Sequence, residues 1–96
     1  KYTGRGGKYM ASDAHAEYLS RVLAIFDRAN VKWQFGNLGN VDKGGGGTIA
    51  LHYARLGIDV LDCGISVLSM HSPFEVISKI DLWTAYKGYL AFICEA

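Results

Sequence analysis

The chain has little proline, cysteine and net charge, and each shortage excludes a class of protein. Its 1 proline and 2 cysteines are too few for a disulfide-stapled scaffold. Ten basic and nine acidic residues leave a net charge of +1. The basic residues are scattered rather than clustered, so electrostatics favour neither nucleic acid nor an anionic membrane as a partner.

The two cysteines, Cys63 and Cys94, lie in one segment with strand character and one with helix character. We expect buried free thiols in a reducing compartment rather than a disulfide, and therefore a cytoplasmic protein. We recognise no signal peptide. The apolar segment near the C-terminus carries Lys79, Asp81 and Lys87, so we do not expect it to span a membrane.

Apolar residues, in contrast, are plentiful and make up 50% of the 96 positions. A domain of this size has much surface and little interior, so this richness indicates burial against something else. The first residue is Lys1, and Lys1-Tyr2-Thr3 resembles a strand entered midway. We expect residues 1–96 to be part of a single domain in a longer chain.

Helix and strand signals alternate along the sequence. Ser12 or Asp13 can cap a helix that runs to about Ala29, and Asn30 suits the left-handed conformation that ends it. A second helix is predicted from Ile49 to Leu56. Gly57 ends it.

Three segments have strand character, and a third helix follows the last of them. The strands are predicted at 31–35, 58–63 and 65–70. Ser72, Pro73 and Glu75 have the pattern of an N-cap, a first-turn proline and a capping box. This order of elements predicts an α/β fold.

Two glycine-rich segments, 3–9 and 36–47, are either surface loops or backbone contacts for an anion or a substrate. A phosphate loop would need its lysine after the last glycine. Because Lys43 precedes Gly44, we reject nucleoside triphosphate binding.

His71 is the best isolated candidate for chemistry, because it follows a predicted buried strand and precedes a capped helix. Three weaker candidates are His15, His52 and Asp62, which are as well explained by capping, packing or surface roles. The sequence contains none of four common site motifs: the His-Glu-x-x-His motif of zinc proteases, a Cys-x-x-Cys pair, the Gly-x-Ser-x-Gly motif of hydrolases, and a dinucleotide-binding fingerprint. Residues alone therefore leave the role of His71 open.

Three stretches, however, resemble one known family. They are Asp42-x-Gly-Gly-Gly-Gly-Thr48-Ile49, Leu56-Gly57-Ile58-Asp59-Val60-Leu61-Asp62-Cys63-Gly64, and Leu68-Ser69-Met70-His71-Ser72-Pro73-Phe74-Glu75. The family is that of the aspartyl aminopeptidases, dinuclear zinc enzymes that include vacuolar aminopeptidase I and many bacterial members. The similarity extends over essentially the whole chain. The all-glycine turn is closest in character to the bacterial members.

The resemblance implies the C-terminal part of a three-layer α/β/α zinc-exopeptidase catalytic domain. His71 matches the last zinc ligand of the family, and Lys1 matches a position that contacts substrate. Tyr9, or its neighbour Met10, matches a second such position. Lys1 would face an acidic N-terminal residue, although the all-glycine turn leaves a preference for acidic substrates open. The general-base glutamate and the other ligands would lie in other segments, so these residues alone would be inactive.

Two functional hypotheses follow from the sequence. The first is a metal-dependent aminopeptidase acting on peptides with two zinc ions, for which cobalt or manganese could substitute, and forming a homo-oligomer such as a dodecamer. The second is a non-catalytic α/β module that oligomerises through its apolar C-terminal helix. Tyr86 and Tyr89 on that helix are expected to pack rather than to react.

Overall fold

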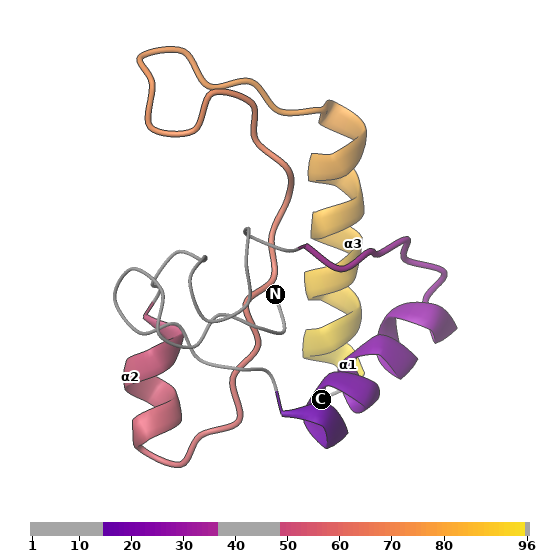
Figure 1. Ribbon diagram of the computed structural model, residues 1–96. Helices are drawn as coiled ribbons and strands as arrows, with labels where there is room; N and C mark the ends of the chain where they lie inside the picture. The colour runs from indigo at the N-terminus through magenta and orange to yellow at the C-terminus, as the bar shows by residue number, and fades with distance from the viewer. Residues whose placement is uncertain (1–14, 37–48, 96) are drawn as a thin grey trace. The chain divides into compact units, whose positions relative to one another are not determined.

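The computed structural model describes residues 15–36 and 49–95, which form three helices (Figure 1). These are α1 (Ala16–Arg28), α2 (Ala50–Arg55) and α3 (Lys79–Glu95). The contacts divide the chain into two units. The first unit comprises Lys1–Val22 and Gln34–Cys63, and the second comprises Leu23–Trp33 and Gly64–Ala96. None of the helices in the described ranges is long and apolar enough to cross a bilayer.

Helix α1 confirms the predicted helix within the described residues, and the predicted start at Ser12 or Asp13 lies outside them. Asn30 ends it with a φ of 55°, in the left-handed region. The Val31 N–H donates to the Phe26 carbonyl at 2.8 Å, and the Asn30 N–H donates to the Asp27 carbonyl at 3.1 Å. These two bonds form a Schellman motif, which pairs carbonyls that the helix leaves free.

Helix α2 ends in the same way, as predicted. Gly57 has a φ of 79°, which costs a glycine little because it has no Cβ. Its N–H donates to the Ala54 carbonyl at 3.0 Å, and the Ile58 N–H donates to the Tyr53 carbonyl at 3.3 Å. Both helix ends were therefore predictable from one residue each.

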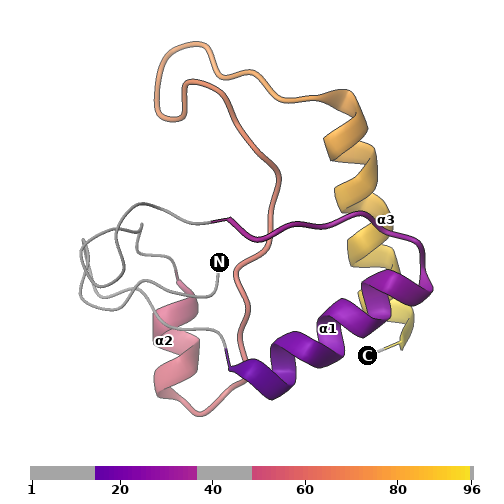
Figure 2. The ribbon, with the colours of Figure 1, turned by 45° about the vertical axis from the view of Figure 1, so that its right-hand side comes forward.

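The second unit has a small core where the end of α1 lies beside α3 (Figures 1 and 2). Phe26 and Val31 are buried, and both side chains lie against Gly88, the buried residue of α3. A methyl group built on Gly88 would lie 3.5 Å from the Phe26 ring and 3.5 Å from Val31. These are ordinary van der Waals distances, so the packing of α3 against the end of α1 leaves room for a methyl group at position 88.

An exposed ion pair joins the same two helices. The Arg28 guanidinium donates to Glu95 Oε2 through Nη2 at 2.7 Å and through Nε at 3.2 Å. Because 62% of the Arg28 side chain and 37% of the Glu95 side chain are exposed, water screens the pair. Its contribution to stability is about 0–1 kcal/mol, so the apolar contact dominates.

The predicted strands do not form within the described residues. Residues 31–36 and 58–67 are not part of any strand ladder there, and the segment 58–67 runs as a drawn-out stretch in Figures 1 and 2. The one bridge in the described ranges pairs Leu68 with Val76 in antiparallel fashion. A strand requires a ladder of backbone hydrogen bonds to a neighbouring strand, so an α/β fold is not seen in the described segments.

The predicted start of the third helix is also wrong. Helix α3 begins at Lys79, and Ser72, Pro73 and Glu75 belong to the loop before it. Ser78 acts as the N-cap, since its Oγ accepts the Asp81 N–H at 3.4 Å. The capping-box pattern misled because Glu75 instead accepts a backbone N–H from His71.

Replacing Ser78 by alanine should lower the free energy of unfolding by about 1 kcal/mol, because the Asp81 N–H loses its cap. Ser72→Ala should leave the stability of α3 almost unchanged, since Ser72 caps no helix here. Urea denaturation followed by circular dichroism measures both. If Ser72→Ala lowered the free energy of unfolding more than Ser78→Ala did, the helix would start at Ser72, as the sequence predicted.

Gly88→Ala should raise the free energy of unfolding by about 0.5–1 kcal/mol, because alanine favours helix and its methyl group meets only ordinary contacts. Gly57→Ala is the matched contrast. It should lower stability by about 1 kcal/mol, because its φ of 79° is unfavourable for a residue with a Cβ. The same denaturation assay measures both, and equal effects would contradict the packing described for Gly88.

Candidate functional site

His71 belongs to a short hairpin closed by Leu68 and Val76, and this hairpin is the orange loop that precedes α3 in Figure 1. Leu68 and Val76 close the hairpin by exchanging two backbone hydrogen bonds, with N···O distances of 2.9 and 3.1 Å. Leu68 is 69% exposed and Met70 60% exposed. The prediction that His71 follows a buried strand is therefore wrong for the described structure. It stands instead in an exposed turn.

The turn has a defined backbone. Ser69 and His71 both have left-handed φ values, 59° and 70°, which are uncommon outside glycine. The Ser72 N–H donates to the Ser69 carbonyl at 3.0 Å, and the Ser72 hydroxyl donates to the Phe74 carbonyl at 2.7 Å. The His71 N–H donates to Glu75 Oε1 at 2.6 Å. Sequence reasoning missed this role of Glu75, because it assigned that residue to a helix.

The other predicted site residues are not brought together in the described part of the chain. Lys1 and Tyr9 lie outside the described residues, as does most of the glycine-rich segment 36–47. His15, beside the start of α1, and His52, in α2, are both exposed. These two histidines keep their surface interpretation.

A zinc site uses three or four protein ligands. Across residues 15–36 and 49–95, no group of three or more His, Cys, Asp or Glu side chains could hold a metal ion. These residues alone therefore do not make a zinc site. The His71 imidazole nevertheless suits one ligand position, since it is exposed and makes no hydrogen bond to the described residues.

The cysteines are free, as predicted, but exposed rather than buried. Although Cys63 is exposed as a residue, partial burial of its sulfur raises the pKa of the thiol, because burial disfavours the thiolate. Thiolate is the form that attacks substrates and binds metals. Cys63 is accordingly poorly suited to either role at neutral pH.

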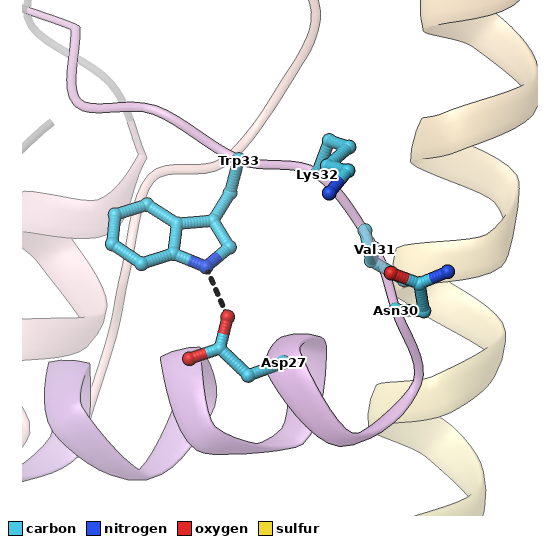
Figure 3. A pocket seen from close by; sticks show the side chains of 5 residues that line it. All are labelled: Asp27, Asn30, Val31, Lys32 and Trp33. Carbon is cyan, nitrogen blue, oxygen red and sulfur yellow. Dashed lines mark hydrogen bonds between the residues drawn. The ribbon is translucent and has the colours of Figure 1, made fainter.

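A shallow recess lies beside the left-handed turn that ends α1 (Figure 3). It is lined by Asp27, Asn30, Val31, Lys32 and Trp33. The Trp33 indole N–H donates to Asp27 Oδ1 at 2.8 Å across it. The Asp27 carboxylate already accepts this bond, and no histidine or cysteine lines the recess. The recess is therefore a local packing feature rather than a reaction centre.

The family model described as "Aminopeptidase I zinc metalloprotease (M18)" matches residues 2–93. The chain belongs to the M18 family.

Its relatives include probable M18 family aminopeptidases from Thermotoga neapolitana and Borrelia garinii. The M18 chain is 52% identical to the first over 93 residues and 52% identical to the second over 95 residues. These alignments cover 97% and 99% of this chain but 21% of each relative. The M18 chain therefore spans about a fifth of the length of these relatives.

Solved structures of the family have a similar backbone. The crystal structure of the M18 aminopeptidase from Thermotoga maritima aligns with a TM-score of 0.86 at 50% identity, over 97% of this chain and 21% of that one. Aminopeptidase I from Clostridium acetobutylicum aligns with a TM-score of 0.83 at 45% identity, over 96% and 20%. The path of the M18 chain thus follows that of aminopeptidases, even where its described segments form no strand ladder.

Proposed function

We propose that the M18 chain is the C-terminal portion of the catalytic domain of a metal-dependent aminopeptidase that removes N-terminal residues from peptides. The observation that carries this proposal is the 52% identity to probable aminopeptidases over nearly the whole chain. The exposed turn at Ser69-Met70-His71-Ser72 adds a side chain of suitable chemistry. With the other groups expected elsewhere, the M18 chain would be inactive by itself.

His71 is the metal ligand that this chain contributes. Its imidazole is exposed at the end of a turn with a defined backbone, and neutral imidazole is a common zinc ligand. In the complete enzyme the site would hold two zinc ions, and cobalt or manganese are alternatives with similar ligand requirements. Bound metal would polarise the scissile carbonyl and activate water.

Lys1 and Tyr9 would line the substrate pocket. The Lys1 ammonium is suited to pair with the carboxylate of an acidic N-terminal residue, as its match to the family implies. The general-base glutamate would come from another segment. Lys1 would then determine the substrate specificity, and His71 would determine the metal content.

The complete domain would be a three-layer α/β/α sandwich. The segment 58–67 supports this proposal, because its backbone follows a drawn-out path of the kind that a strand takes in a sheet (Figures 1 and 2). The TM-score of 0.86 supports it as well, since the path of this chain is close to that of an aminopeptidase. Strand pairing would then be supplied by neighbouring segments of the domain.

Helix α3 is the best candidate for a surface that is covered in the complete enzyme. Its apolar side chains are unusually exposed, with Ile80 at 76%, Ile93 at 74% and Trp83 at 61%. We expect a homo-oligomer, such as a dodecamer, in the cytoplasm. The alternative function, a non-catalytic oligomerisation module, also explains this face but does not require His71.

The test of the proposed function is the zinc content of the full-length protein and its His71→Ala variant. The variant should lose about one of two zinc ions per subunit, and its kcat should fall by about 100-fold or more, since even groups that only orient a ligand affect activity by about 10–100-fold. His52→Ala is the matched control and should keep full zinc content, because His52 is an exposed residue of α2. Unchanged zinc content in His71→Ala would contradict the ligand assignment, whereas a full-length parent protein without zinc or activity would favour the non-catalytic alternative.

A further inference from the structure

The turn that carries His71 contains two residues in an unfavourable backbone conformation. Ser69 and His71 have φ values of 59° and 70°, where a Cβ crowds the backbone. Such conformations persist only when surrounding contacts fix them, and they gather at functional sites. The contacts that fix this turn therefore decide where the His71 ring lies.

Two of these contacts shape the turn without a hydrogen bond to an atom of His71. The Leu68–Val76 pair closes its base. Ser72 bonds to Ser69 through its N–H and to Phe74 through its hydroxyl. The Ser72-to-Ser69 bond closes a four-residue turn with Met70 and His71 at its centre, and a positive φ at the third residue is typical of such a turn. Neither contact, however, pairs the His71 N–H.

The Glu75 carboxylate is the group that bonds to His71 directly. Its Oε1 accepts the His71 backbone N–H at 2.6 Å. This distance is short for an N–H···O bond, and a carboxylate acceptor gives a bond roughly twice as strong as a neutral one. In the described loop, it is the side-chain contact that ties the His71 peptide to the far arm of the hairpin.

We propose that Glu75 is a positioning residue that holds the His71 backbone in its left-handed conformation and so aims the imidazole. It acts on the backbone N–H and not on the ring, which leaves both ring nitrogens available for other partners. The inference deepens the proposed function and rests on it where it concerns metal binding. The hydrogen bond itself does not depend on that function.

Glu75 could instead matter as a charge, by binding a metal ion or by moving a proton. The Glu75→Gln substitution separates these roles, because it keeps an acceptor oxygen at the same place and removes the charge. A positioning role predicts that Glu75→Gln retains function and that Glu75→Ala loses it. A ligand or proton-transfer role predicts that both variants lose it.

Hydrogen exchange of the full-length protein, read by mass spectrometry on peptides spanning 68–77, tests the positioning directly. In Glu75→Ala this segment should exchange about 10-fold faster, as expected for a lost bond to a charged acceptor, whereas Glu75→Gln should stay within about 3-fold of the parent protein. Glu17→Ala is the matched control, since Glu17 is an exposed residue of α1 outside the turn. Unchanged exchange in Glu75→Ala would overturn the proposal.

Zinc affinity of the same variants tests the consequence for the ring. Glu75→Ala should weaken zinc binding by about 10–100-fold, the usual cost of removing a group that orients a ligand, and Glu75→Gln should restore most of it. Equal losses in the two variants would overturn the positioning role. The zinc content of His71→Ala tests the proposed function separately. The exchange rates test the hydrogen bond between His71 and Glu75 whether or not His71 binds metal.

Discussion

The contact of Phe26 and Val31 with Gly88 is the interaction on which the second unit depends. It joins the end of α1 to α3, with the Phe26 ring and Val31 each 3.5 Å from the place that a Cβ of residue 88 would take. Val31 reaches this contact because Asn30 turns the backbone through a left-handed conformation. Away from it, apolar side chains of α3 such as Ile80 and Ile93 remain largely exposed. The described core is therefore small, and most of the apolar richness of the sequence is not used in it.

The loop before α3 is held by a different kind of interaction. Its hydrogen bonds are short in range and link residues within the hairpin, from the Leu68–Val76 pair to the bond between His71 and Glu75. Such a loop can keep its geometry without a buried neighbour. This explains how an exposed histidine can have a defined backbone. In the account proposed here, that histidine is one ligand of a site completed by other segments.

Local signals in the sequence predicted local structure well. Asn30 and Gly57 end their helices as expected, because a left-handed residue at a helix end needs only its own neighbours. The strands failed for the opposite reason, since a strand depends on a ladder of hydrogen bonds to a distant segment, and no such ladder forms over 31–36 or 58–67 among the described residues. The start of α3 failed because Ser72 and Glu75 matched a capping box, yet Glu75 bonds to His71 and Ser78 caps the helix. Of the candidate site, His71 was singled out from the sequence, but its place in an exposed turn and its link to Glu75 were not predicted.

The central claim is that His71 binds the metal of an M18 aminopeptidase. A crystal of the full-length protein, measured at the zinc absorption edge, tests it most directly through the anomalous difference map. The account predicts a zinc peak about 2.0–2.1 Å from a ring nitrogen of His71, the usual zinc–imidazole distance. Zinc peaks bound entirely by other residues, with the His71 ring outside coordination distance, would contradict it.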